Sequence, residues 1–251
     1  MTTKVKAAAY RLIGGSKTVY SADYEEKISI FNNFKKQIEK LIGLVATLVT
    51  DNLATELKQK ISKDTVDSGM NKYEKVGQAL YKYSSEIEND SFAVVLKRAK
   101  EVFDNAGQKH REFRKNMLEK VQNPMKEWIE TNAKHVTKEL KSINNKRDEL
   151  DCAINKLRKK PDDLEIQAVK DRAENVFQVE LKKTDKLLDD EIMESQSLIS
   201  SAMITLMEVI EDYNKSMKEI FKDFNRAVEY DKNKRNLMIV LFVLIGSEDL
   251  G

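Results

Sequence analysis

The sequence predicts an all-α protein built from long helices, and three observations support this fold class. Only 8 Gly and 2 Pro occur in 251 residues, so few turns are available. Charged residues make up 34% of the chain, hydrophobic residues 41% and aromatic residues 7%, which is typical of amphipathic helices. Apolar residues also recur at steps of three and four along most of the chain, the spacing of one helix face.

The first helix is predicted over residues 24–61. Its apolar positions alternate steps of three and four residues, with one position skipped, and this spacing indicates a single buried face. The residues on that face are Tyr24, Ile28, Phe31, Ile38, Leu41, Val45 and Leu48. Residues 62–71 contain Ser, Asp and Gly, and we expect them to form a connector.

The second helical run is predicted over residues 76–157, with a local interruption at residues 89–91. Pro124 lies inside this run, where it removes a backbone donor and crowds the preceding turn. We therefore expect a bend at Pro124 rather than an end of the helix. The apolar face of this run includes His110, Phe113 and Trp128, which we expect to be core residues.

A third helix is predicted from Leu164 to about Arg235, after the periodicity lapses at residues 159–163. We expect Asp162 or Asp163 to cap it. At 1.5 Å per residue this helix would be roughly 110 Å long. Apolar stripes of this length stay exposed on a single chain, so we expect a rod-like molecule that pairs into a homodimer.

The net charge of +2, from 44 basic and 42 acidic residues, does not point to a particular partner. The distribution of charge along the chain is uneven. Residues 134–160 hold nine basic and four acidic side chains, a difference of +5. Residues 162–211 hold five basic and thirteen acidic side chains, a difference of −8. We therefore expect basic and acidic regions on different parts of a long molecule.

Three features of the sequence bear on the cellular compartment of the protein. The single cysteine, Cys152, cannot form an intrachain disulfide and is expected to be a packed or half-exposed structural residue. The N-terminus lacks the apolar core of a signal peptide, so we expect a cytoplasmic protein. The strongly apolar run at residues 237–245 is too short for a bilayer core, which needs about 20 residues. We expect this tail to dock on the dimer, with contact with a bilayer or an unusual chain end as the alternatives.

Sequence motifs for catalysis are absent. Gly14 and Gly15 are not followed by a Gly-Lys-Ser/Thr sequence, and the chain has no His-Glu-x-x-His pair and no glycine-flanked nucleophilic serine. With two histidines and one cysteine, metal ligands would have to be carboxylates, which carry little information in so charged a chain. We therefore expect no enzymatic activity, no cofactor, no metal and no nucleic-acid partner.

Four segments together resemble the BAR domains of the endophilin and amphiphysin type, the N-BAR group. They are similar, in order and spacing, to the start of that family's first helix, the start of its second helix, its proline-bearing bend, and the arginine and Leu-Asp motif before its basic tip. The segments are Gly14-Gly15 with Thr18 and Asp-Tyr-Glu-Glu-Lys at 23–27, Val-Gly-Gln-Ala-Leu at 76–80, Val-Gln-Asn-Pro-Met at 121–125, and Lys-Arg-Asp-Glu-Leu-Asp at 146–151.

The resemblance implies three long, kinked, antiparallel helices per chain and a six-helix, crescent-shaped homodimer. It implies a basic concave face and basic tips that bind anionic phospholipid membranes and sense or generate curvature, in endocytosis or vesicle trafficking. The implied organisation is an amphipathic segment at 1–20 and a BAR domain at 21–236, and the apolar tail at 237–251 lies beyond the region that the resemblance covers. By position, the lipid-contacting residues would be Lys134, Lys138, Lys141, Lys146, Arg147, Lys156, Arg158, Lys159 and Lys160.

The N-terminal segment is expected to insert into the membrane as an amphipathic helix, as the family resemblance implies. The alternative is a frayed terminus without a membrane role. The side chains expected to insert or to flank the insertion are Val5, Ala9, Leu12, Ile13, Lys4, Lys6 and Arg11.

A second function is open to the same helical dimer. It could serve as a scaffold that binds a small GTPase or a cytoskeletal partner without bending membranes. Such a scaffold would not need the N-terminal segment, and binding to anionic liposomes would separate the two functions.

Overall fold

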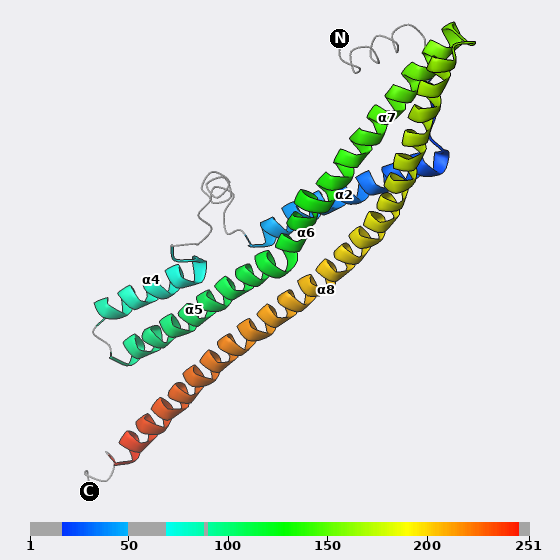
Figure 1. Cartoon of the computed structure of the whole chain (residues 1–251). Coiled ribbons are helices and arrows are strands. Elements are labelled where there is room, and N and C mark those ends of the chain that lie inside the picture. The colour runs from blue at the N-terminus through cyan, green and yellow to red at the C-terminus, as the bar shows by residue number, and fades with distance from the viewer. Residues whose placement is uncertain (1–16, 50–68, 88–89, 246–251) are drawn as a thin grey trace. The chain divides into compact units, whose positions relative to one another are not determined.

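The computed structural model describes residues 17–49, 69–87 and 90–245, and every regular element in these ranges is helical (Figure 1). Two π-helical segments, η1 (Met117–Gln122) and η2 (Ile129–Ala133), lie between α5 and α7. The α-helices are α2 (Ala22–Val49), α4 (Lys72–Glu86), α5 (Asp90–Asn116), α6 (Asn123–Trp128), α7 (Lys134–Lys159) and α8 (Leu164–Ile245). The predicted all-α fold is therefore confirmed for the described residues.

The described residues form two compact units, which we treat separately. The first unit holds residues 17–44 and 122–203. The second unit holds residues 45–49, 69–87, 90–121 and 204–245. Helices α2 and α8 therefore contribute to both units.

As the sequence predicted, Pro124 does not end the second helical run. Helical backbone continues from Asp90 to Lys159, with Pro124 in the first turn of α6. The π-helical turns of η1 precede this proline and those of η2 follow α6. A π turn is wider than an α turn, so it makes room for a proline ring that would otherwise crowd the preceding carbonyl. The predicted interruption near residue 89 is also present, because α4 ends at Glu86 and α5 begins at Asp90.

The start of α8 follows the predicted cap, but its end differs from the prediction. The Asp163 carboxylate accepts hydrogen bonds from the backbone N–H groups of Glu165 and Ile166, both at 3.1 Å, so Asp163 rather than Asp162 is the cap. The helix then continues to Ile245, about ten residues beyond the predicted end. No Gly or Pro occurs between Leu164 and Gly246, so nothing in this sequence breaks the helix earlier.

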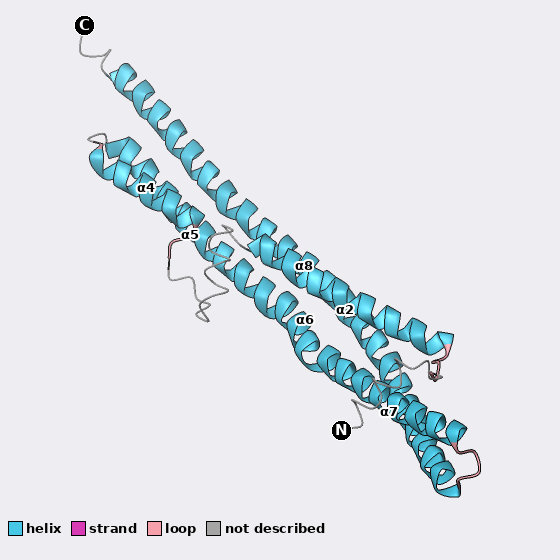
Figure 2. Ribbon diagram, turned by 90° about the horizontal axis from the view of Figure 1, so that it is seen from above, coloured by secondary structure: helices cyan, strands magenta, loops and turns pink. Residues whose placement is uncertain are grey.

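In the first unit, α7 and α8 run antiparallel from the turn at residues 160–163, with α2 alongside them (Figures 1 and 2). The Phe31 ring of α2 lies 5.9 Å from the Trp128 ring of α6, measured between centroids. The Lys27 ammonium of α2 donates to the carboxylates of Asp185 and Asp189 on α8, each at 2.9 Å. Fully buried apolar side chains of this unit include Phe31, Ile38, Val136, Ile143, Phe177 and Leu188.

In the second unit, α4 packs closely along α5 (Figure 2). Two buried glycines, Gly77 on α4 and Gly107 on α5, allow this approach. Asn71 caps α4 by accepting from the backbone N–H groups of Tyr73 and Glu74, and its side-chain amide donates to the carbonyl of Gly107 at 2.8 Å. The cap of α4 is therefore also a contact with α5.

Replacing Gly107 by Ala is expected to destabilise the second unit by about 1–2 kcal/mol. A Cβ at this position would lie 2.6 Å from Cγ of Glu74 and 3.1 Å from Oδ1 of Asn71. Glu74 cannot move away cheaply, because its carboxylate accepts from Arg111 Nε at 3.0 Å and from the Asn71 N–H at 2.8 Å. Chemical denaturation monitored by circular dichroism measures the effect.

Gly43→Ala is the matched control for Gly107→Ala. A Cβ added at Gly43 meets no atom of the described residues within 4 Å, apart from its chain neighbours and its own helix backbone. This substitution therefore leaves only the helix-propensity gain, which is expected to stabilise the protein by up to about 1 kcal/mol. Equal effects of the two substitutions would contradict the close packing of α4 on α5.

Candidate functional site

Three predicted lipid-contacting lysines form an exposed stripe on α7. Lys134, Lys138 and Lys141 are all exposed, and their spacing of four and three residues places them on one side of the helix. Val136 and Ile143, which are buried, lie on the opposite side at 100° per residue. The stripe is thus the outward face of a helix whose inward face is core.

Glu139, the carboxylate nearest to this stripe in sequence, is directed away from it toward α8. Glu139 is half-buried, and its Oε2 lies 3.5 Å from Nζ of Lys183 on α8. An acid directed toward the neighbouring helix neutralises the lysine stripe less than one placed within it would. The α7 stripe therefore presents a local excess of positive charge.

Two other predicted residues, Lys146 and Arg147, are half-buried and engaged within the unit. The Lys146 ammonium donates to the Glu149 carboxylate at 3.1 Å. The Arg147 guanidinium lies over the Tyr20 ring, 4.5 Å from its centroid, which is cation–π distance. These contacts link neighbouring side chains on α7 and attach Tyr20 to the helix. The sequence-based prediction assigned both residues to lipid contact and did not include this structural role.

Residues 17–21, before α2, are attached to α7. The backbone N–H and the hydroxyl of Thr18 both donate to Oδ1 of Asp151, at 2.8 and 2.6 Å. The Tyr20 hydroxyl donates to Oδ1 of Asn144 at 3.2 Å, and burial raises the pKa of this phenol above its ordinary value. The Thr18 and Leu-Asp segments quoted for the family resemblance therefore meet in space.

The predicted membrane-inserting residues, Lys4 to Ile13, lie outside the described residues.

The predicted basic tip is exposed but only weakly charged overall. The four basic residues of the tip are exposed at the end of α7 and in the following turn: Lys156, Arg158, Lys159 and Lys160. Asp162, Asp163 and Glu165 follow within five residues, so residues 156–165 carry four positive and three negative charges, a difference of +1. Leu164, between two of these acids, is 84% exposed.

A buried carboxylate on α8, which the sequence-based analysis missed, joins α6 and η2 to α8. Glu191 is only 7% exposed, and its Oε2 accepts from the indole Nε1–H of Trp128 at 3.2 Å. The Asn132 amide donates to both oxygens of Glu191 at 3.2 Å and to Glu194 at 3.1 Å. Trp128 and Asn132 are four residues apart, a weak signal of a shared face toward one acceptor.

Titration of Glu191 is expected to appear in the fluorescence of Trp128, the only tryptophan. Burial raises the pKa of Glu191 above its ordinary value of 4.5, and Glu194 raises it further, while the Asn132 and Trp128 hydrogen bonds and the charge of His135 lower it. The folded state therefore holds this proton more tightly than the unfolded state. Through this group, stability rises as the pH falls through the raised pKa toward 4.5.

A pH titration of Trp128 emission should show a step centred above 4.5 in the wild type. Glu191→Gln, which cannot titrate, should lack this step. A step that persists in the variant would assign the titration to another group.

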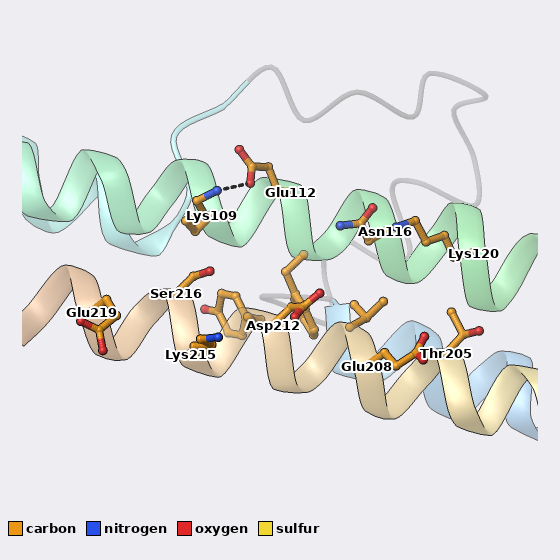
Figure 3. A pocket seen from close by; sticks show the side chains of 13 residues that line it. Lys109, Glu112, Asn116, Lys120, Thr205, Glu208, Asp212, Lys215, Ser216 and Glu219 are labelled. Carbon is orange, nitrogen blue, oxygen red and sulfur yellow. Dashed lines mark hydrogen bonds and ion pairs between the residues drawn. The ribbon is translucent and has the colours of Figure 1, made fainter.

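An open groove of about 600 Å³ lies between α5, η1 and α8 in the second unit (Figure 3). Phe113 and Val209 line it and are buried, and the Phe113 ring stacks on Tyr213 with centroids 4.5 Å apart. Its charged lining residues mix both signs: Lys109, Lys120, Lys215, Glu112, Glu208, Asp212 and Glu219. A mixed lining of this kind does not select an anionic or a cationic small molecule.

None of the helices among the described residues has an apolar stretch long enough to cross a bilayer. Within the same residues, no group of three or more His, Cys, Asp or Glu side chains is placed to hold a metal ion.

Comparisons with known proteins identify the family. A model of the BAR domain matches residues 4–230. The fold is similar to the N-terminal I-BAR domain (1–259) of IBARa from D. discoideum, at 12% identity and a TM-score of 0.50, covering 91% of this chain and 100% of that one. No curated protein matches.

The resemblance to BAR domains seen in the sequence is thus confirmed at the level of the family. The N-BAR assignment is not confirmed, because the family model is that of the BAR domain in general and the similar solved structure is an I-BAR domain. Proteins of the BAR family bind membrane lipid, generally as dimers, and act in membrane curvature. The chain belongs to the BAR domain family of non-enzymatic, membrane-binding scaffolds.

Proposed function

We propose that this protein is a dimeric membrane-binding module that attaches to anionic bilayers through the α7 lysine stripe and senses or generates curvature there. The observation that carries the proposal is the exposure of Lys134, Lys138 and Lys141 on the face of α7 opposite its buried residues. Lys156 and Lys159, which are also exposed, lie on the same side of α7 as the stripe at 100° per residue. Lys146 and Arg147 stabilise this part of α7 through contacts with Glu149 and Tyr20.

The magnitude of the electrostatic contribution favours the stripe over the tip. Each lysine near an anionic leaflet contributes about 1 kcal/mol, so three on each chain of a dimer contribute about 6 kcal/mol. At the tip, Asp162 and Glu165 are exposed and offset part of this attraction. Screening over about 8 Å means that only charges that approach the bilayer closely count.

Dimerisation is proposed through apolar side chains that one chain leaves exposed. On α8, Ile204 and Met207 are 62% and 65% exposed and lie three residues apart, hence on one side of the helix. They flank the open groove of the second unit, which is lined by Thr205 and Glu208. Burying the exposed parts of these two side chains contributes about 2–4 kcal/mol per chain, which favours a second copy of the chain as their partner.

The cellular setting that we propose is the cytoplasmic face of a membrane, in endocytosis or vesicle trafficking. In this proposal the segment at residues 1–20 adds an amphipathic insertion of the N-BAR kind, and residues 237–251 form an appended tail to the domain at 21–236. The insertion and the domain bounds rest on the family resemblance of the sequence, and the tail rests on its run of apolar residues.

Cosedimentation with vesicles tests the proposed function. Vesicles with about one third phosphatidylserine should bind the protein at low salt, and binding should fall as salt rises toward physiological strength. Neutral phosphatidylcholine vesicles should bind it poorly. Electron microscopy of the bound anionic vesicles should show tubules or a preferred vesicle radius. Equal, weak binding to both vesicle types would instead favour a protein-binding scaffold.

A further inference from the structure

Among the residues whose side chains the structure describes, which exclude 227, 228 and 230–245, the most exposed large apolar side chain lies at the tip. Leu164, the first residue of α8, is 84% exposed. Its exposure serves no local structural purpose. The helix cap is made by Asp163, and the position before the cap, where an apolar residue would complete a hydrophobic staple, is Asp162.

The surroundings of Leu164 point to a lipid surface rather than to another protein. Exposed cations lie at Lys159 and Lys160, and exposed acids lie at Asp162 and Glu165. The cores of protein interfaces are depleted of charged residues, so this setting does not favour a second copy of the chain. The bilayer interface suits it, because an apolar side chain can enter the acyl boundary while flanking cations stay among the phosphates.

The charge of the tip is too small to hold it firmly to a bilayer by itself. With a difference of +1 over residues 156–165, electrostatic attraction alone holds the tip to a bilayer weakly. A second, unscreened contribution would come from removing Leu164 from water. We propose that Leu164 inserts into the bilayer and anchors the tip, an inference that rests on the membrane binding proposed above.

Leu164→Ser tests this insertion by affinity. It should weaken binding to phosphatidylserine vesicles about tenfold, because partial burial of each leucine contributes about threefold and a dimer presents two. The loss should be similar at low and high salt, since apolar transfer is not screened. Val169→Ser, at a 49% exposed position five residues further along α8, should change binding by less than about twofold.

Fluorescence quenching locates the side chain directly. The indole introduced by Leu164→Trp should be quenched by vesicles of brominated phosphatidylserine, whereas the one introduced by Val169→Trp should not. The native Trp128 is 4% exposed and stays out of reach of the bromines.

The outcomes separate the two proposals. A wild-type protein that does not bind anionic vesicles contradicts the proposed function. Normal binding by Leu164→Ser, together with an unquenched indole at position 164, overturns the insertion and leaves the proposed function intact.

Discussion

Reversing the charge of the α7 stripe is expected to reduce affinity for anionic vesicles by more than about 100-fold. The triple substitution Lys134→Glu, Lys138→Glu and Lys141→Glu removes three attractive contacts of about 1 kcal/mol each from every chain. It also adds three carboxylates that anionic lipids repel. Because all three positions are exposed, circular dichroism should show unchanged helicity. Vesicle cosedimentation across a range of lipid concentrations gives the affinity.

A matched triple substitution on α8 controls for net charge. Lys218, Lys222 and Arg226 are exposed, spaced by four residues each and outside the lining of the groove, so their reversal to Glu changes the charge equally with similar geometry. This control should bind anionic vesicles within about threefold of the wild type, because screening confines attraction to cations next to the bilayer. Equal losses in the two triple variants would mean that net charge, and not the α7 stripe, governs binding.

Placing charge on the proposed dimer surface is expected to convert the dimer to monomers. Ile204→Lys combined with Met207→Lys places two ammonium groups on each chain, so a two-fold interface would have to bury four. Burying these charges without partners is unfavourable. Each buried, unpaired charge costs several kcal/mol, more than the interface gains from these side chains. Size-exclusion chromatography with light scattering should report half the wild-type mass. Vesicle binding should also weaken, because each particle then presents half the cations.

Val176→Lys combined with Val179→Lys is the control for the dimer surface. These two residues are also exposed, at 38% and 57%, and three positions apart on α8. They lie in the first unit, outside the proposed surface, so this variant should stay dimeric. A dimer that survives the Ile204 and Met207 substitutions but not this pair would move the interface to the first unit.

Much of the helical architecture was predictable because its causes are local. The three- and four-residue spacing placed Tyr24, Phe31 and Ile38 on the buried face of α2. Pro124 inside a long periodic run was correctly interpreted as compatible with a continuous helix. The end of α8 was predicted too early, because a change from mixed to wholly apolar residues near 237 does not break a helix in the way that Gly or Pro does.

The candidate site was predictable only in part. The sequence identified Lys134, Lys138 and Lys141 as a group, and the structure places them on one exposed side of α7. Sequence reasoning did not separate them from Arg147, whose guanidinium lies over Tyr20. It also missed Leu164, because the exposure of a single apolar residue at a helix start has no periodic signal.

The sequence by itself determined the helices, the break near residue 89 and a cap at Asp162 or Asp163, since helical periodicity and capping depend on residues within one or two turns of each other. Only the tertiary structure decided which polar side chains form hydrogen bonds within the protein and which face outward. Thr18 and Asp151 are 133 residues apart in the chain, and Trp128 and Glu191 are 63 apart, yet each pair is hydrogen-bonded. Such partners are set by the packing of separate helices, because burial makes an unpaired polar group costly wherever its partner lies in the sequence.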